Sequence, residues 1–422
     1  MRRWARISLS LAAGAAMLAA SASCRQRAPD KPARPAAVAP ALPPVLPMSR
    51  PVMAVETHPA PLLATPPGLA PWPSFRGGPD QRGLAGGTLA RDFVPLWRFP
   101  TGGPVAGSPV VAEGKVFVGS NDGAVYAIDL ASGSKVWSAR TGDSVSASPL
   151  HVGGRIYVGS VDRHFYCLSA ATGGLIWEFA TEGDIRAAAA WAPDPDGPDG
   201  KILVGSYDFK LYCLRASDGH KLWDVPTEYY VNGTPALAGG HAVLGGCDTN
   251  LYSIALADGQ VTLKLPVGEE LAFIPASVAL DGTQAFLATF EGKVMRIDLA
   301  AGRIDWTIAL KEEQEFCSAA LSDTRVLVGG GDNVMHCLDR RDGHKVWDFP
   351  TGGPIAGSPV ICDGKVVFGS GDGRLYVLSL ADGSLLWSRD LGQPVASGPA
   401  VADGKIIVGC NDGFVYAFGP KE

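Results

Sequence analysis

The sequence lacks several features that would assign a function directly. It contains no C-x-x-C pair, and its seven histidines are scattered without the spacing of metal ligands, which excludes the common zinc motifs. It also lacks an excess of positive charge. The net charge is −6, and beyond residue 50 the chain carries 28 basic and 41 acidic residues. Such an acidic body argues against nucleic acid as a partner. After residue 20, no apolar run is long enough to span a membrane.

What the sequence has is a repeat of about 40 residues, marked by tryptophan. Seven of the ten tryptophans follow one another at steps of 40, 40, 46, 83, 41 and 40 residues, and Leu263 lies where the long step lacks one. Eight units of this period predict an array of propeller blades. The tryptophans are Trp97, Trp137, Trp177, Trp223, Trp306, Trp347 and Trp387.

The unit between Trp97 and Trp137 predicts four short strands joined by tight turns. An apolar pair at 110–111 precedes the turn Glu113-Gly114, residues 115–120 alternate as a half-buried strand does, and an Asp-Gly turn leads to a strand at 124–129. A fourth strand begins at Lys135. The fold class is therefore all-β, an eight-bladed propeller of four-stranded antiparallel blades.

An aspartate in the second turn and a tyrosine on the third strand recur in register. Such aspartates accept backbone N–H bonds in turns, and aromatic bulk in a repeat packs between blades, so we interpret both sets as structural. Glu291 replaces the aspartate in the fifth copy. The sets are Asp122, Asp162, Asp208, Asp248, Asp332, Asp372 and Asp412, and Tyr126, Tyr166, Tyr212, Tyr252, Tyr376 and Tyr416.

The ends of the repeat predict how the ring closes. The segment 93–99 resembles a fourth strand but precedes the first complete blade, and the last copy stops at 415–418 without a fourth strand. We expect the N-terminal strand to pair with the C-terminal blade, which removes the open edges of a linear array. The propeller then spans residues 72–422.

The N-terminus has the features of a targeting segment. Three arginines precede an apolar run at 7–20 and small residues that lead to Cys24, so residues 1–23 are predicted to be a signal peptide. Two interpretations compete. Ala20-Ser21-Ala22 suits ordinary signal peptidase, whereas Ser21-Ala22-Ser23-Cys24 resembles a lipobox with Cys24 as the lipidated residue. Residues 24–71 are rich in Pro and Ala, as expected of a disordered linker that tethers a domain.

The other cysteines are predicted to be free. They number seven, and most replace small residues of the repeat in separate blades, as buried packing residues do. They are Cys167, Cys213, Cys247, Cys317, Cys337, Cys362 and Cys410.

The repeat resembles the tryptophan-docking unit of pyrroloquinoline-quinone (PQQ)-type propellers. The segment Ala127-Ile-Asp-Leu-Ala-Ser-Gly-Ser-Lys-Val-Trp137 carries the resemblance, and the segments at 167–177 and 337–347 repeat it. The lead-in Trp72-Pro-Ser-Phe-Arg-Gly77 is similar to that of many bacterial PQQ-like repeat proteins. The resemblance covers residues 72–422.

This resemblance implies one of two functional classes. Quinoprotein dehydrogenases bind PQQ and calcium over the channel, whereas BamB-type lipoproteins of the outer-membrane assembly machinery are non-catalytic. The dehydrogenases resembled here carry a vicinal Cys-Cys pair and long insertions that roof the active site; this chain has neither. The resemblance therefore favours a BamB-type binding scaffold of the bacterial envelope without a cofactor. The alternative is a PQQ-dependent dehydrogenase.

The loops that lead into the blades diverge most, and binding residues tend to lie on such loops. Tyrosine and arginine are favoured interface anchors, and the glutamates form either a solvated acidic rim or a docking patch for a basic partner or cation. No nucleophile accompanies them, so no catalytic residue is predicted. The partner-binding candidates are Arg186, Tyr229, Tyr230, Glu269, Glu270, Glu312, Glu313 and Glu315.

The third copy contains an aspartate-rich insertion at 193–200. Asp194, Asp196 and Asp199 with nearby glycines resemble a short calcium loop, because oxygen ligands suit calcium. The prolines and the missing bidentate glutamate favour a solvated hairpin instead.

The sequence thus predicts a monomeric, exported propeller that has an envelope protein partner. It would lie at the periplasmic face of the outer membrane as a lipoprotein, or in the soluble periplasm.

Overall fold

The protein is described here by a computed structural model that covers residues 72–194, 200–269, 272–310 and 317–421. The chain divides after Pro67, and its second unit, Gly68–Glu422, contains all of these residues. They form strands and no helix, so none of them belongs to a helix that could cross a bilayer.

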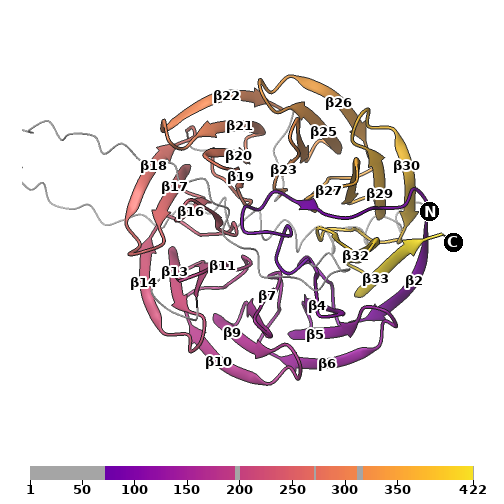
Figure 1. Ribbon diagram of the computed structural model, residues 1–422, viewed down its shortest axis with the longest axis horizontal. Helices are drawn as coiled ribbons and strands as arrows, with labels where there is room; N and C mark the ends of the chain where they lie inside the picture. The colour runs from indigo at the N-terminus through magenta and orange to yellow at the C-terminus, as the bar shows by residue number, and fades with distance from the viewer. Residues whose placement is uncertain (1–71, 195–199, 270–271, 311–316, 422) are drawn as a thin grey trace, which may run out of the picture. The chain divides into compact units, whose positions relative to one another are not determined.

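The strands form a closed ring of eight antiparallel sheets, which confirms the predicted propeller (Figure 1). Within each blade we call the strands a to d, from the channel to the rim. Blades 1 to 4 comprise β3 (Val110–Ala112), β4 (Lys115–Ser120), β5 (Ala124–Asp129) and β6 (Lys135–Arg140); β7 (Leu150–Val152), β8 (Arg155–Gly159), β9 (His164–Ser169) and β10 (Leu175–Ala180); β11 (Ala190–Ala192), β12 (Lys201–Ser206), β13 (Lys210–Arg215) and β14 (Lys221–Pro226); and β15 (Ala236–Ala238), β16 (His241–Gly245), β17 (Asn250–Ala255) and β18 (Val261–Pro266).

Blades 5 to 8 repeat this arrangement. They comprise β19 (Ala279–Asp281), β20 (Gln284–Ala288), β21 (Lys293–Asp298) and β22 (Arg303–Ala309); β23 (Ala320–Leu321), β24 (Arg325–Gly329), β25 (Val334–Asp339) and β26 (Lys345–Pro350); β27 (Val360–Cys362), β28 (Lys365–Gly369), β29 (Arg374–Ser379) and β30 (Leu385–Asp390); and β31 (Ala400–Ala402), β32 (Lys405–Gly409), β33 (Phe414–Pro420) and β2 (Phe93–Pro100). The short strand β1 (Leu84–Ala85) adds to blade 7 by parallel pairing with β27.

The closure of the ring follows the prediction. Strand β2 supplies the rim strand of blade 8 and pairs antiparallel with β33, with Trp97 opposite Ala417 and Phe99 opposite Val415. The ring of Phe93 lies edge-on against Trp387 of blade 7, at 5.3 Å between centroids. The first and last strands thus share one blade and leave no open end in the array.

Each tryptophan of a d strand docks onto the next blade. The Trp137 indole donates a hydrogen bond of 3.0 Å to the Ala170 carbonyl, and its ring lies against Gly173 in the next c–d turn. A Cβ on Gly173 would approach the ring to 2.6 Å, so this close contact requires glycine. In blade 4, Leu263 takes the tryptophan position opposite Gly302, and a Cβ there would meet its side chain only at 3.5 Å.

The repeated aspartate and tyrosine connect a b–c turn to the third strand and to the leading loop of the same blade, as in blade 1. Asp122 accepts hydrogen bonds from the Tyr126 hydroxyl at 2.6 Å and from the Gly102 backbone N–H at 2.6 Å. Burial raises the pKa of Asp122, but the bonds from Tyr126, Gly102 and Ala124 outweigh it and hold the value below its usual range. Burial and the aspartate raise the pKa of Tyr126 to about 12. These residues are therefore structural, as predicted.

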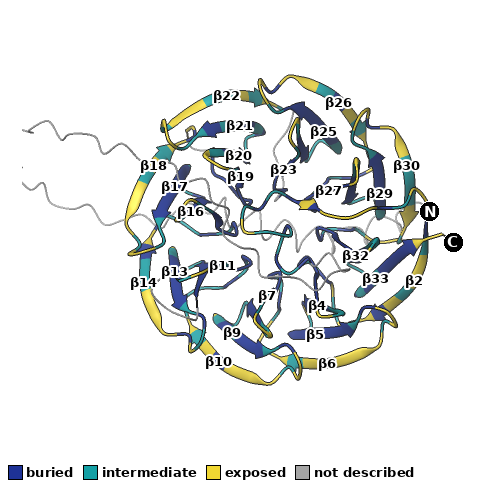
Figure 2. Ribbon diagram, in the orientation of Figure 1, coloured by how far each residue is buried: buried dark blue, intermediate teal, exposed yellow. Residues whose placement is uncertain are grey.

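The antiparallel order gives the ring two different faces. The inter-blade loops (d to a) and the b–c turns share one face, which we call the loop face, since Asp122 in a b–c turn binds Gly102 in an inter-blade loop. The a–b and c–d turns share the opposite turn face, where Leu130 bonds to Gly114. Figure 2 shows that exposure concentrates on the outer d strands and the loops, while the inner strands are buried.

Candidate interaction site on the loop face

An aromatic cluster lies on the loop face where blades 3 and 4 meet. It combines Tyr207 and Phe209 from the b–c turn of blade 3 with Tyr229 and Tyr230 from the loop that leads into blade 4. Tyr207 stacks on Tyr230 with centroids 4.5 Å apart, and Phe209 stacks on Tyr229 at 5.5 Å. Tyr229 and Tyr230 meet edge-to-face at 4.5 Å, which joins the two stacks into one cluster. We call these four residues the aromatic platform.

Arg186 extends the platform from the preceding inter-blade loop. Its guanidinium lies 5.4 Å from the centroid of Tyr207, and its Nη2 donates to the Asp184 carboxylate at 2.8 Å. The Tyr207 hydroxyl donates to Asn232 Oδ1 at 2.6 Å. The structure therefore brings together Arg186, Tyr229 and Tyr230, three of the predicted partner-binding candidates. Rings held by stacking and hydrogen bonds lose little side-chain entropy when a partner binds.

Phe209 holds its backbone in a conformation that phenylalanine rarely adopts. Its φ is 69°, in the left-handed region, at the turn position that glycine fills in blades 1, 5, 7 and 8. Arg163, Thr249 and Asn333 fill it in blades 2, 4 and 6, at φ 71°, 68° and 65°. Its side chain is 38% exposed, so burial does not explain why it is there. Positive φ at this position is therefore part of the repeat, and what distinguishes blade 3 is the aromatic side chain, which stacks on Tyr229.

Tyr207 and Phe209 were not predicted. They stand in the positions of Asn121 and Gly123, which were interpreted as a turn that only connects strands. The signal was present, because Tyr-Asp-Phe replaces Asn-Asp-Gly in one copy of the turn. The matching of this unusual turn to the Tyr229-Tyr230 loop depends on the spatial order of the blades.

The predicted acidic candidates are only partly described. Glu269 is exposed on the loop that leads into blade 5, and its backbone carbonyl accepts the Ala272 N–H at 2.8 Å. Glu270, Glu312, Glu313 and Glu315 lie outside the described residues. An acidic docking patch therefore remains a prediction.

The aspartate-rich insertion offers one described carboxylate. Asp194 Oδ1 lies 3.7 Å from Lys201 Nζ, so an ammonium group already faces this carboxylate. Asp196 and Asp199 lie outside the described residues. Calcium binding at Asp194, Asp196 and Asp199 stays a prediction.

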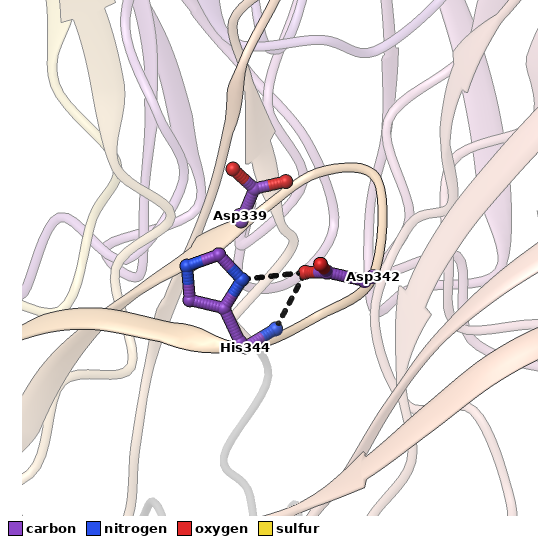
Figure 3. A group of neighbouring side chains, drawn as sticks. All are labelled: Asp339, Asp342 and His344. Carbon is purple, nitrogen blue, oxygen red and sulfur yellow. Dashed lines mark hydrogen bonds and ion pairs between the residues drawn. The ribbon is translucent and has the colours of Figure 1, made fainter.

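The described residues include one group with metal-ligand geometry, on the c–d turn of blade 6 (Figure 3). Ligand atoms of Asp339, Asp342 and His344 lie within 4.8 Å of one another. His344 Nδ1 lies 2.6 Å from Asp342, and Asp339 accepts the Arg341 backbone N–H at 2.9 Å. Hydrogen bonds from Arg341 lower the pKa of Asp339, so turn contacts already satisfy these carboxylates. We interpret the group as a charged turn.

The seven described cysteines are free and buried, as predicted. Burial raises the pKa of Cys167, Cys213, Cys337 and Cys410 to about 12. They are neutral thiols at pH 7 and poor nucleophiles or metal ligands.

In the part of the chain that the structure describes, no group with metal-ligand geometry lies at the channel, where the dehydrogenase alternative implies PQQ and calcium. Among the described residues the one cluster of carboxylates with ligand geometry is at the c–d turn of blade 6, on the turn face. The N-terminal segment 72–89 crosses the channel (Figure 1). Its Arg76 guanidinium is bonded to backbone carbonyls. We derive no chemical step through this cofactor.

Comparison with solved structures finds the same fold in proteins of both classes. BamB from Moraxella catarrhalis is 17% identical with a TM-score of 0.65, covering 78% of this chain and 98% of its own. Quinohemoprotein alcohol dehydrogenase from Comamonas testosteroni is 14% identical with a TM-score of 0.70, covering 84% and 81%. A europium-containing methanol dehydrogenase is 14% identical with a TM-score of 0.66, covering 83% and 98%. At these identities the likeness shows the fold alone.

Comparison with curated proteins gives no match. A family model described as outer membrane protein assembly factor BamB matches residues 94–191, 166–316 and 310–422, which together cover all eight blades. The chain therefore belongs to the family of outer membrane protein assembly factor BamB.

Proposed function

We propose that this protein is a non-catalytic binding or assembly scaffold of the bacterial cell envelope, similar to BamB, and that it binds a protein partner through the aromatic platform and Arg186. The observation that carries the proposal is Phe209. Four blades have glycine at this turn position and three have Arg, Thr or Asn, whereas Phe209 places an exposed aromatic ring there, stacked on Tyr229. Its position makes sense as part of a binding surface.

The composition of the platform also supports protein binding. Tyrosine and arginine are enriched among the residues that dominate binding energy at protein interfaces. Tyr229 and Tyr230 are half-buried and Phe209 is exposed, so part of the aromatic ring surface of the platform faces solvent. This combination suits a partner surface with an apolar centre and polar surroundings.

The family and the N-terminal sequence motivate the proposed location. Residues 1–23 act as a signal peptide, Cys24 carries a lipid, and residues 24–71 form a linker to the propeller at 72–422. The protein then lies at the periplasmic face of the outer membrane as a monomeric lipoprotein. If signal peptidase cleaves after Ala22 instead, the same propeller works in the soluble periplasm.

A co-purification experiment with paired variants tests the binding surface. Tagged wild-type protein and the double variant Arg186→Ala/Tyr230→Ala are isolated from cell envelopes under the same conditions. The matched control is Arg98→Ala/Phe414→Ala, since Arg98 lies 4.9 Å from the Phe414 ring and removing this pair changes the same chemistry in blade 8.

We expect the platform variant to lose its envelope partner while the control retains it, with both melting as cooperatively as the wild type. Retention of the same partner by the platform variant, or its loss from both variants, contradicts the proposed surface. The same experiment with Glu269→Gln separates the acidic loops from the platform.

A further inference from the structure

The N-terminal segment 72–89, which we call the strap, runs around the inside of the channel. Its backbone carbonyls accept N–H bonds from the inner strands of six blades. Figure 1 shows this segment in indigo, crossing the centre of the ring. The donors are Val111, His151, Leu237, Leu280, Leu321 and Ile361, at 2.7 to 2.9 Å. Beyond β1, the Leu89 N–H donates to Asp363 in the a–b turn of blade 7, so the strap ends on the turn face.

Arg76 is the buried charge of the strap. Its side chain has five N–H donors, as every arginine does. Nε donates to the Gln81 carbonyl at 2.7 Å, Nη1 to the Ser318 carbonyl at 3.2 Å, and Nη2 to the Ala319 carbonyl. Arg76 is 3% exposed. The three bonds leave two N–H donors of a buried cation without an acceptor among the described residues.

No described carboxylate forms an ion pair with Arg76. The charge of the Asp80 carboxyl raises the pKa of Arg76 without an ion pair between them. This carboxyl accepts the Arg82 backbone N–H, and burial raises its pKa above its usual value. The neighbouring Cys317 is no counterion at neutral pH, because burial raises the pKa of its thiol to about 11. Burial lowers the pKa of Arg76 itself to about 10, so it remains a cation at neutral pH. Buried charges in proteins are generally paired.

A belt of hydroxyl groups continues from Arg76 around the channel. The Ser318 N–H donates to Ser358 Oγ at 3.0 Å, and the Ser277 N–H donates to Ser318 Oγ at 3.1 Å. Ser148 and Ser277 accept from Ser108 and Thr234 in the same way, at 2.8 Å each. These hydroxyls act as acceptors in the belt, and within the described residues their own protons have no acceptor. The Arg76 guanidinium touches the belt at Ser318.

Three further strap atoms are buried without a partner in the described part of the chain. Two are donors, Trp72 Nε1 and Arg82 Nε, and one is an acceptor, Gln81 Oε1. Counted over the described strap and serine belt, with the two N–H groups of Arg76 and the serine protons, unpaired donors outnumber unpaired acceptors. Buried polar groups are usually satisfied by protein, ordered water or an ion, and an excess of donors around a cation suits an anion.

We propose that the strapped end of the channel binds one small monovalent anion of halide size at Arg76, between the strap and the serine belt. The anion accepts the two remaining Arg76 N–H bonds and neutralises the buried charge. It binds only when the strap is seated, so it holds the strap in the channel. This proposal does not depend on the function proposed above, since the strap and the aromatic platform share no residue.

Thermal unfolding of the full chain in sodium bromide tests the proposal. Bromide replaces gluconate at constant total salt, which keeps charge screening constant. Wild-type protein is compared with Arg76→Gln and Arg76→Lys. Asp363→Asn is the matched control, because it weakens the strap at Leu89 and leaves Arg76 intact.

We expect the melting temperature of wild type to rise by a few degrees and to saturate with bromide, because a ligand that binds only the folded state stabilises it. Arg76→Gln loses this rise, Arg76→Lys keeps a smaller one, and Asp363→Asn melts lower but keeps the full rise. Equal bromide responses of wild type and Arg76→Gln contradict the site.

Anomalous diffraction from bromide-soaked wild-type crystals gives a test that no variant's folding can obscure. We expect one bromide peak at hydrogen-bond distance from the Arg76 guanidinium. A water molecule there, or a peak without any bromide effect on the melting temperature, means that Arg76 only fastens the strap to backbone carbonyls, and the proposal is then wrong.

Discussion

At the residue scale, the backbone conformation of Phe209 and its stacking on Tyr229 have opposite effects on the stability of the protein. An L-residue in the left-handed region costs about 1–2 kcal/mol relative to the right-handed helical region, and glycine avoids this cost. The stack of Phe209 on Tyr229 contributes about 0.5–1.5 kcal/mol in return. The position is therefore close to neutral for stability.

The two contributions can be separated with two substitutions at residue 209. Phe209→Ala keeps the strain of the positive φ and loses the stack, whereas Phe209→Gly loses the stack and the strain. We therefore expect Phe209→Gly to be more stable than Phe209→Ala by about 1 kcal/mol in urea unfolding. If the alanine variant were equally or more stable, the strain at this turn would have to be rejected.

The tryptophan docking sites make a second prediction for single residues. Trp177 donates to the Ala216 carbonyl at 3.1 Å and packs against Gly219, so we expect Trp177→Ala to destabilise the protein by about 3–5 kcal/mol. Leu263→Trp should cost less, because the contact at Gly302 is looser than in the other blades. Chemical unfolding measures both. An unchanged midpoint for Trp177→Ala would contradict the docking role.

At the element scale, β2 closes the ring. It occupies the rim of blade 8 by pairing with β33, and the packing of Phe93 on Trp387 fastens it to blade 7. Deletion of residues 93–99 should expose the edge of β33 and cause aggregation, because an unpaired edge accepts strands from other molecules. Light scattering after size-exclusion chromatography detects this. A soluble monomer with unchanged melting temperature would exclude the closure mechanism.

The hydrogen bond between the aspartate of the b–c turn and the tyrosine of the third strand should make the stability of the protein depend on pH. Tyr126 has its pKa raised to about 12, so the folded state keeps this proton while the unfolded state releases it near pH 10. The stability from this group is complete below pH 10 and is lost as the pH rises toward 12. Tyr126→Phe removes the hydrogen bond to Asp122 and also this pH dependence.

We therefore expect the stability difference between wild type and Tyr126→Phe to be larger at pH 8 than at pH 11. Urea unfolding at both values measures it, and Tyr229→Phe serves as the control because Tyr229 lies neither in a b–c turn nor on a third strand. A constant difference between the two pH values means that the Tyr126 proton is not linked to folding.

At the scale of the whole molecule, periodicity explains what could be predicted from the sequence. The spacing of Trp137, Trp177 and Trp347 indicated the blades, and the incomplete last copy indicated the closure, because each feature recurs in register. Arg186, Tyr229 and Tyr230 stood out as departures from the repeat. The path of the strap could not be predicted, since its contacts to six blades depend on backbone carbonyls and have no sequence pattern.

The same limit applies to the aromatic platform. Tyr207 and Tyr230 are far apart in their repeats, one in a b–c turn and the other in an inter-blade loop. They stack because the ring places consecutive blades side by side on one face. Sequence alone therefore identifies half of the platform, and the ring geometry identifies the rest.

The last prediction concerns the two functional classes that share this fold. A PQQ enzyme must hold the cofactor and calcium over the channel and keep water away from them. This chain has no vicinal cysteine pair, and its strap crosses the channel with Arg76 bonded to carbonyls.

We expect the purified protein, mixed with PQQ and calcium, to show no substrate-dependent dye reduction and no change in melting temperature. Thermal stabilisation is the sharper measurement, because a ligand at about 100 times its dissociation constant adds about 2.7 kcal/mol. A clear increase of the melting temperature with PQQ that disappears when Glu269, Glu270 and Glu312 are neutralised would contradict the scaffold function and favour the dehydrogenase.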